Sequence, residues 1–267
     1  MKTRTDNGSS SADFWAGEEV DHYETTQRLM VEQKAAVLDN IVRIVDYFCR
    51  KRSFFAPTIL DVGCGTGALT GMLLEKIAGS RVTGVDGSEE MLKAFDRYCR
   101  SRFPSRCEAI HADFNRRDFW GPMKAGTYDV LVSSMALHYL TDDAAARFFK
   151  AAHSRLTDHG VLVACIGNLS ESPALREMAY QFKLEFAYTN RKANGYDGDF
   201  AAFKADFASR VERIRIHWRS PGSYLALLDD AGFQEVDMVW HLWLKSIFVA
   251  LKPPPAGEGR LTDRTSV

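Results

Sequence analysis

The chain has 267 residues, 46% of them hydrophobic, and a formal net charge of −1 from 34 Lys and Arg against 35 Asp and Glu. This balance gives no overall basic field, which disfavours nucleic acid as a partner. No uninterrupted apolar segment approaches the ~20 residues of a membrane span, so no membrane partner is expected. The five cysteines are scattered without a C-x-x-C pair and are expected to be small core residues in the reducing cytoplasm.

The two ends of the chain are expected to be tails around one folded unit. Residues 1–13 are polar and have no apolar core, which predicts a disordered tail rather than a signal peptide. Three consecutive prolines from Pro253 onwards predict the end of the folded part and a second disordered tail at 253–267. The remaining residues, 14–252, suit one α/β domain with a modest insertion.

From residue 25 to residue 170 the sequence alternates between apolar strand-like runs and helical periodicity. An amphipathic helix is expected at about residues 25–51, where apolar residues recur at helical spacing. Strands are expected at Thr58–Val62, Arg81–Asp86, Cys107–His111, Tyr128–Ser133 and Gly160–Ile166. Helices should follow the first, second and fourth of these, with Ser88 and either Thr141 or Asp142 as N-caps. The alternation predicts a parallel, doubly wound α/β sheet.

The C-terminal part departs from this alternation. Ser220 and Pro221 predict the start of a helix, with the proline at the first helical position, and Gly232 predicts its end. Residues 234–251 then form two strand-like runs with no helix between them. Such strands should pair antiparallel.

The most informative motif follows the first strand, where Asp61 precedes three glycines that alternate with small residues, Gly63, Gly65 and Gly67. Glycines at every second position disfavour both helix and strand, so the backbone must turn tightly there with a ligand against it. The usual occupant is a nucleotide-like cofactor at the N-terminus of a helix. The run also fits the dinucleotide pattern G-x-G-x-x-G/A, which keeps an NAD(P)-dependent oxidoreductase open. The Asp61 carboxylate disfavours a pyrophosphate and suits a cationic or amine-bearing ligand.

Acidic residues also follow the next two strands. Asp86 ends the second strand about 20 residues beyond Gly67, where a carboxylate can accept both hydrogen bonds of a ribose diol. Ser88 is available as the helix cap and leaves Asp86 for that role. Asp113 and Phe114 follow the third strand, where Asp113 either caps a turn or contacts the cofactor.

Together these motifs resemble the class I S-adenosylmethionine-dependent methyltransferases, whose first motif reads (D/E)-x-G-x-G-x-G. The resemblance covers about residues 55–170 well and residues 220–251 in outline. It implies a mostly parallel, doubly wound, seven-stranded sheet with an antiparallel last strand. It also implies S-adenosyl-L-methionine as cofactor, S-adenosyl-L-homocysteine as product, and in-line methyl transfer to an acceptor, for which a small molecule is expected. An RNA or protein methyltransferase, and a protein that uses the adenosyl cofactor for other chemistry, remain alternatives.

The resemblance also assigns roles to individual residues. Asp86 would bind the ribose, Asp113 the adenine amino group, Ser133 would lie beside the methionine part, and Tyr23 resembles a tyrosine of the family's N-terminal lid. The expected cofactor-binding set is Tyr23, Asp61, Gly63, Cys64, Gly65, Gly67, Asp86, Gly87, Met91, Asp113, Phe114 and Ser133.

The loop after the fourth strand carries the candidate catalytic residues. His138 is the first candidate for a general base, because imidazole titrates near neutrality and this loop should border the transferring methyl group. The alternative is that His138 packs or binds cofactor, and Tyr139 is a second catalytic candidate. No His, Cys or Asp spacing indicates a metal site, so no metal is expected.

Two segments outside the core should decide the acceptor. Residues 14–51 are expected to form an N-terminal helical lid rich in aromatic residues at its start. Residues 170–219 are expected to form a cap with helices after Ser172 and around 200–207, and an alternating, strand-like run at 214–218. The cap's aromatic residues could line an apolar pocket or form the cap's own small core. The arginines of 210–219 could bind an anion or form a solvated face.

Overall fold

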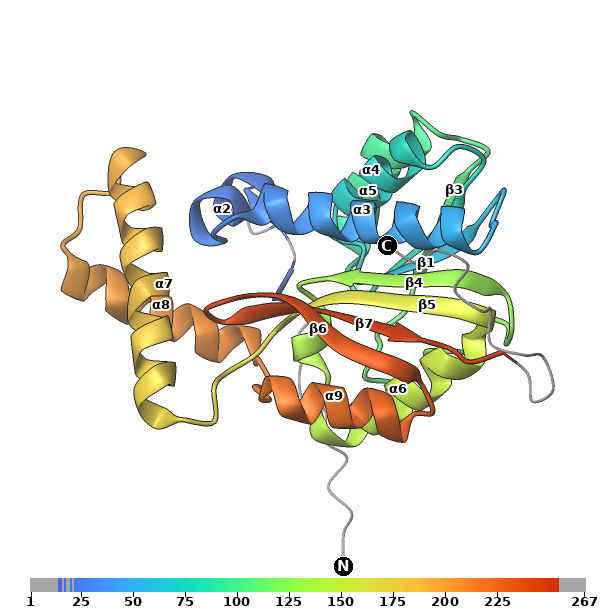
Figure 1. Ribbon diagram of the computed structural model, residues 1–267. Helices are drawn as coiled ribbons and strands as arrows, with labels where there is room; N and C mark the ends of the chain where they lie inside the picture. The colour runs from blue at the N-terminus through green and yellow to red at the C-terminus, as the bar shows by residue number, and fades with distance from the viewer. Residues whose placement is uncertain (1–13, 16, 18–19, 21, 255–267) are drawn as a thin grey trace, which may run out of the picture.

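The computed structural model describes residues 14, 15, 17, 20 and 22–254 (Figure 1). The tail expected at 1–13, and all but the first two residues of the tail expected at 253–267, lie outside the described residues. The boundaries of the domain therefore stay predictions at both ends.

The core is one seven-stranded sheet in the order β3-β2-β1-β4-β5-β7-β6. Its strands are β1 (Thr58–Val62), β2 (Arg81–Asp86), β3 (Cys107–His111), β4 (Tyr128–Ser134), β5 (Leu156–Gly167), β6 (Gln234–Leu242) and β7 (Lys245–Leu251). The first five are mutually parallel, and β7 pairs antiparallel with both β5 and β6. The predicted mostly parallel sheet with an antiparallel last strand is confirmed.

Helices cover both faces of this sheet (Figure 1). On one face lie α3 (Lys34–Lys51), α4 (Ala68–Lys76) and α5 (Glu89–Phe95), the last continued by a π-helical turn, Asp96–Arg100. On the other lie α6 (Asp142–Arg155) and α9 (Pro221–Asp230). Alternate residues of a strand point to opposite faces, so Ile59 packs into the first layer and Leu60 and Val62 into the second. The doubly wound prediction is confirmed.

The predicted N-caps of the core helices are present. Ser88 Oγ accepts a hydrogen bond from Met91 N at 3.1 Å, and Thr141 Oγ1 accepts one from Ala144 N at 3.3 Å. Of the two candidates for the cap of α6, Thr141 therefore fills that position and Asp142 lies in the first turn. Ser220 likewise caps α9 through Ser223 N at 3.1 Å. Local capping chemistry thus fixes where these helices begin.

Two predicted elements differ from the structure. The helix expected at about 25–51 is broken into α2 (Tyr23–Met30) and α3, because Gln33 adopts the left-handed conformation with φ 52°. The strand expected at 214–218 does not exist. The chain stays helical to Ile214, and Arg215 then turns it with φ 57°. The backbone N–H of His217 donates to His138 O at 2.9 Å rather than to a strand.

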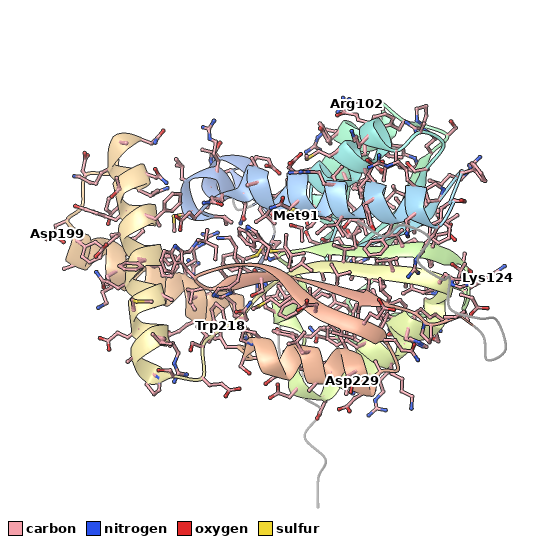
Figure 2. All side chains as sticks on the ribbon, viewed as in Figure 1. Met91, Arg102, Lys124, Asp199, Trp218 and Asp229 are labelled. Atoms are coloured by element: carbon pink, nitrogen blue, oxygen red, sulfur yellow. The ribbon has the colours of Figure 1, made fainter. Side chains whose placement is uncertain are left out.

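The cap segment (residues 170–219) consists of α7 (Pro173–Ala193) and α8 (Phe200–Ile214), which stand at one end of the sheet beside α2 (Figure 1). In Figure 2, Asp199 marks its outer end and Trp218 the point where it returns to the sheet. Leu184, Ala187 and Phe203 are buried between its helices, with further aromatic side chains packed around them. Most of the cap's aromatic residues therefore form its own small core.

Candidate active site

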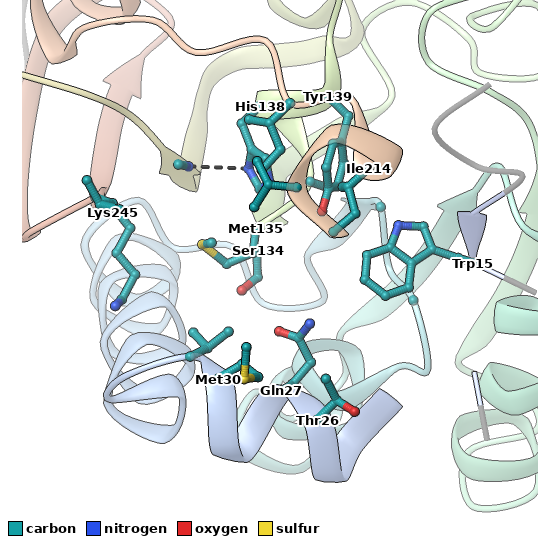
Figure 3. A pocket seen from close by; sticks show the side chains of 18 of the residues that line it. Trp15, Thr26, Gln27, Met30, Ser134, Met135, His138, Tyr139, Ile214 and Lys245 are labelled. Atoms are coloured by element: carbon teal, nitrogen blue, oxygen red, sulfur yellow. Dashed lines mark hydrogen bonds between the residues drawn. The ribbon is translucent and has the colours of Figure 1, made fainter. Parts of the chain in front are cut away.

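A cavity lies at the carboxyl ends of the parallel strands, where ligands of doubly wound proteins usually bind (Figure 3). Its floor comes from the ends of β1, β2, β4 and β5 and from the first residue of β7. Residues of α2 and α8 close it from the sides. Of the region expected to form the lid, only residues up to Glu32 line the cavity, because α3 packs on the sheet face.

The glycine loop is shaped partly by packing and partly by the cavity. Gly63, Gly65 and Gly67 all have positive φ, at 70°, 54° and 90°. A Cβ on Gly63 would stand 2.2 Å from the Cβ of Ala136, and one on Gly67 would stand 2.6 Å from Cys99 Sγ. A Cβ on Gly65 would meet nothing closer than the Tyr23 hydroxyl at 3.9 Å. Gly65 is thus the glycine whose backbone is open to a ligand in the cavity.

Asp86 lines the cavity and is held by this loop. Its Oδ2 accepts a hydrogen bond from Gly65 N at 2.9 Å, and its Oδ1 accepts one from Ser88 N at 2.9 Å. Burial raises the pKa of Asp86, and the backbone hydrogen bonds from Ser88 and Gly65 oppose that effect. An ionised carboxylate has about four lone-pair sites. Asp86 therefore keeps acceptor capacity for a ligand while Ser88 caps the helix, as predicted.

Asp113 and Phe114 line the cavity, as do Gly87 and Met91. Asp113 Oδ1 accepts a hydrogen bond from Asn115 N at 2.9 Å. The side chain therefore fixes a turn and also lines the cavity, and its contact with the cofactor stays a prediction.

The start of α2 is tied to the glycine loop. Thr66 Oγ1 donates to Glu24 Oε1 at 2.5 Å, and Lys34 Nζ pairs with Glu24 Oε2 at 2.8 Å. The Tyr23 ring packs edge-on against Trp15 at a centroid distance of 5.3 Å, and both rings line the cavity. Burial raises the pKa of Tyr23, so its hydroxyl stays protonated and can donate.

Four residues of the expected cofactor-binding set do not line the cavity: Asp61, Cys64, Gly67 and Ser133. Asp61 is 1% exposed and accepts a hydrogen bond from Thr70 Oγ1 at 2.6 Å. Burial, with a smaller contribution from Asp86, raises the pKa of Asp61 to about 7. Ser133 Oγ donates to Val62 O at 2.8 Å, and its neighbour Ser134 faces the cavity instead. Asp61 and Ser133 hold the elements that flank the loop through these hydrogen bonds. Contact of all four residues with the cofactor stays a prediction.

His138 and Tyr139 lie in a 3₁₀ turn, Leu137–Tyr139, and both line the cavity. Gly167 N donates to His138 Nδ1 at 3.3 Å, the dashed line in Figure 3. This bond assigns the proton of the neutral ring to Nε2. Burial lowers the pKa of His138 to about 3, and the Trp218 ring lies nearly parallel to it at a centroid distance of 6.5 Å.

The other end of the cavity contains residues that no sequence pattern singled out. Lys183 from α7 and Lys245 from β7 line it together with Met30 and Glu32. Neither lysine belongs to a sequence motif, so the sequence did not indicate that the two side chains would line the same part of a cavity. Among the described residues, no group of three or more His, Cys, Asp or Glu side chains could hold a metal ion.

Known proteins resemble this chain in both sequence and fold. A family model described as a methyltransferase domain matches residues 59–160. The carboxy-S-adenosyl-L-methionine synthase of Nautilia profundicola is 23% identical over 194 residues, which are 73% of this chain and 76% of that protein. The crystal structure of magnesium protoporphyrin IX methyltransferase from Synechocystis PCC 6803 with bound SAH superimposes with a TM-score of 0.59. That match has 16% identity and covers 90% of this chain and 97% of the other. Together these matches support a class I S-adenosylmethionine-dependent methyltransferase.

Other relatives of this methyltransferase match over shorter lengths. The trans-aconitate 2-methyltransferase of Paracidovorax citrulli is 30% identical over 125 residues, which are 46% of this chain and 44% of that protein. Across the trans-aconitate methyltransferases that it matches, the chain spans between 31% and 45% of their length. None of the described helices is both long enough and apolar enough to cross a membrane.

The cofactor of this methyltransferase is S-adenosyl-L-methionine, and the cavity residues fit it. Gly65 leaves backbone open to the cavity, and Asp86 offers carboxylate lone pairs for a ribose diol. Phe114 and Met91 supply apolar surface beside Asp113, suited to a planar base. Ten of the fourteen predicted site residues line this one cavity: Tyr23, Gly63, Gly65, Asp86, Gly87, Met91, Asp113, Phe114, His138 and Tyr139.

Proposed function

We propose that this methyltransferase transfers the methyl group of S-adenosyl-L-methionine to a small-molecule acceptor held between the glycine loop and the cap segment. The observation that carries the proposal is the continuity of the cavity. It runs from Gly65 and Asp86 at one end to Trp243 and Lys245 at the other, under Phe207 and Ile214 of the cap. A cavity closed by a lid and a cap suits a small molecule, whereas a polymer needs an open groove.

The cofactor, when bound, supplies a methyl group already activated by the positive charge of its sulfonium. The residues of the chain contribute alignment and exclusion of water. Gly65 and Asp86 would fix the cofactor's sugar, and the loop from Met135 to Tyr139 forms part of the cavity wall, midway between the two ends. The aromatic side chains Trp15 and Trp218 line the same cavity.

In this mechanism His138 acts as a hydrogen-bond donor rather than as a general base. Its Nδ1 already accepts from Gly167 N, and its Nε2 carries the remaining proton. A ring whose pKa is about 3 is also a weak base at neutral pH. We therefore assign His138 the role of orienting the acceptor through Nε2–H, with Tyr139 beside it.

The names of several relatives support a small acceptor. Trans-aconitate, magnesium protoporphyrin IX and the carboxylated cofactor itself are small molecules. The compact cap agrees with this, because most of its aromatic residues pack among themselves.

The test is transfer of a labelled methyl group. The protein is incubated with S-adenosyl-L-methionine carrying a trideuteromethyl group and with a cell extract divided into small molecules, RNA and protein. We expect the label in a small molecule by mass spectrometry, and its loss in the Asp86→Ala variant. Label in RNA or protein alone would replace the proposed acceptor class. Tight binding of NADH without binding of S-adenosylhomocysteine would contradict the cofactor.

A further inference from the structure

The end of the cavity away from the glycine loop carries two lysines from distant parts of the chain. Lys245 opens β7 and stands directly opposite Gly167 of β5 in the sheet register. It is 5% exposed, and its side chain extends into the cavity toward Met30 (Figure 3). Its ammonium makes no hydrogen bond with any residue that the structure describes, and its nearest aromatic contact is the Trp240 ring at 6.0 Å.

Lys183 approaches the same place from the cap segment. Its Nζ donates to the backbone carbonyl of Met30, which uses one of the three ammonium donors. Glu32 is the acidic side chain that acts on both lysines, but within the described residues it forms an ion pair with neither. Two cations therefore share one end of the cavity with a single, more distant carboxylate.

Two buried ammonium groups close to each other are unfavourable unless an anion binds them. A buried ammonium without a partner loses its hydration and gains nothing in return. Burial lowers the pKa of Lys245, and burial together with the charge of Lys245 lowers that of Lys183 to about 7. A methionine at position 245 would fill similar space without this penalty. The fold therefore does not need these charges for its own packing.

We infer that Lys183 and Lys245 bind a carboxylate carried by the methyl acceptor. This inference rests on the proposed function, because it describes the acceptor of that same cavity. The charges favour a monoanion over a phosphate dianion, since two ammonium groups and Glu32 leave one positive charge to be neutralised. Trp218, Trp243 and Tyr180 line the same cavity, so the acceptor should join its carboxylate to an apolar or aromatic body.

The opposite end of the cavity has a different charge. Asp86 and Asp113 lie there, and the third cation of the lining, Arg210, stacks on the Phe14 ring at 5.0 Å. Arg210 also acts on Tyr139, beside the cofactor residues. An anionic group is thus repelled from the cofactor end and attracted to the lysine pair.

The experiment compares acids with their neutral amides on protein saturated with S-adenosylhomocysteine. The probes are phenylacetate against phenylacetamide and hexanoate against hexanamide, titrated calorimetrically below the pKa of Lys183. We expect each acid to bind about tenfold or more tightly than its amide, since hydrogen bonds to charged groups are among the stronger ones. Equal affinity within both pairs would overturn the inference.

Variants assign the preference to the lysine pair. Lys245→Met should abolish most of the acid preference and raise the melting temperature of the ligand-free protein, because a buried unpaired charge is removed. Glu32→Gln should increase acid affinity, which a merely damaged site would not do. Lys204→Met removes a charge from the exposed face of α8 and should leave the preference unchanged. An acid preference that survives Lys245→Met and Lys183→Met together would overturn the assignment.

Failure of this inference is separable from failure of the proposed function. S-adenosylhomocysteine binding is measured first and does not involve the lysines. If it binds and the acids show no preference, the lysine assignment falls and the cofactor assignment stands. If it does not bind, the acid and amide titrations on the free protein still report on the lysine pair.

Discussion

The two ends of the cavity are built in different ways. The cofactor end takes most of its lining from residues 63–114, near the carboxyl ends of β1, β2 and β3, and Asp86 is held there by hydrogen bonds from the backbone. The acceptor end is assembled from the 3₁₀ turn after β4, from α7, from the end of α8 and from the start of β7. One end is therefore specified by a local motif, and the other by the packing of distant segments.

The two ends of the cavity also differ in charge and in their tolerance of side-chain substitution. Acidic side chains lie at the cofactor end and lysines at the acceptor end. Gly63 and Gly67 have no space for a Cβ, whereas Lys245 makes no hydrogen bond with any described residue and Lys183 donates to one backbone carbonyl, that of Met30. We conclude that the cofactor end is fixed by steric limits on the backbone, and that the acceptor end can be changed by side-chain substitution without loss of the fold. Four predictions test this difference.

The largest effect is expected from Gly63→Ala. The new Cβ would overlap the Cβ of Ala136 at 2.2 Å, and φ of 70° disfavours any side chain. We expect the variant to lose about 3–5 kcal/mol of unfolding free energy and its affinity for S-adenosylhomocysteine. Urea denaturation measures the first and calorimetry the second.

Gly65→Ala is the matched control for that variant. Its φ of 54° is equally unfavourable, but its Cβ would stand 3.9 Å from the nearest atom. We expect a loss of only about 1–2 kcal/mol, from the left-handed backbone, together with weaker cofactor binding. Equal destabilisation of the two variants would show that packing against Ala136 does not constrain the loop.

The second prediction concerns Asp86→Ala. It removes the acceptor of Gly65 N and Ser88 N and the carboxylate proposed to bind the ribose. Binding of S-adenosylhomocysteine should weaken by roughly 1–3 kcal/mol, while acid preference at the lysine pair stays the same. Asp143→Ala, on the surface at the start of α6, is the control. An unchanged dissociation constant for Asp86→Ala would contradict the ribose assignment.

The same difference explains what could be predicted from the sequence. Asp86 and Asp113 could be placed because Asp86 ends the second strand and Asp113 closely follows the third, and parallel strands bring their carboxyl ends to one edge. The left-handed conformations of Gln33 and Arg215 could not be predicted, because neither residue type demands them. That conformation breaks the helix at Gln33 and turns the chain at Arg215. Lys183 and Lys245 lie 62 positions apart in the sequence, in a helix and a strand, and only tertiary packing brings them together. The cap's aromatic residues could not be divided between core and cavity for the same reason.

The third prediction uses the buried acid beneath the glycine loop. Asp61 has a pKa of about 7 in the folded protein, against an ordinary value of 3.8, because burial disfavours its charge. Between these values the folded state binds the extra proton, so stability falls as pH rises from 3.8 to about 7. Asp61→Asn should remove this part of the pH dependence, a slope of at most about 1.4 kcal/mol per pH unit. Urea denaturation across this range measures it, and parallel pH curves for the two proteins would contradict the assignment.

The smallest effect is expected at the boundary between the two ends, where His138 accepts from Gly167 N through Nδ1 and is proposed to donate to the methyl acceptor through Nε2–H. The pKa of His138 in the folded protein is about 3, below the ordinary 6.5. Between pH 6.5 and about 3 the unfolded state therefore binds one more proton at this residue, so the protein loses stability as pH falls through that range. At neutral pH the ring should be a single neutral tautomer with its proton on Nε2, held by Gly167 N. Nitrogen chemical shifts of the imidazole, assigned by their absence in His138→Gln, measure this directly. A ring that becomes protonated near its ordinary pKa would restore His138 as a general base, and would mean that the wall between the two ends is open to water. A ring that stays neutral down to acidic pH would place the proton acceptor, if the reaction needs one, on the acceptor molecule or at the lysine end.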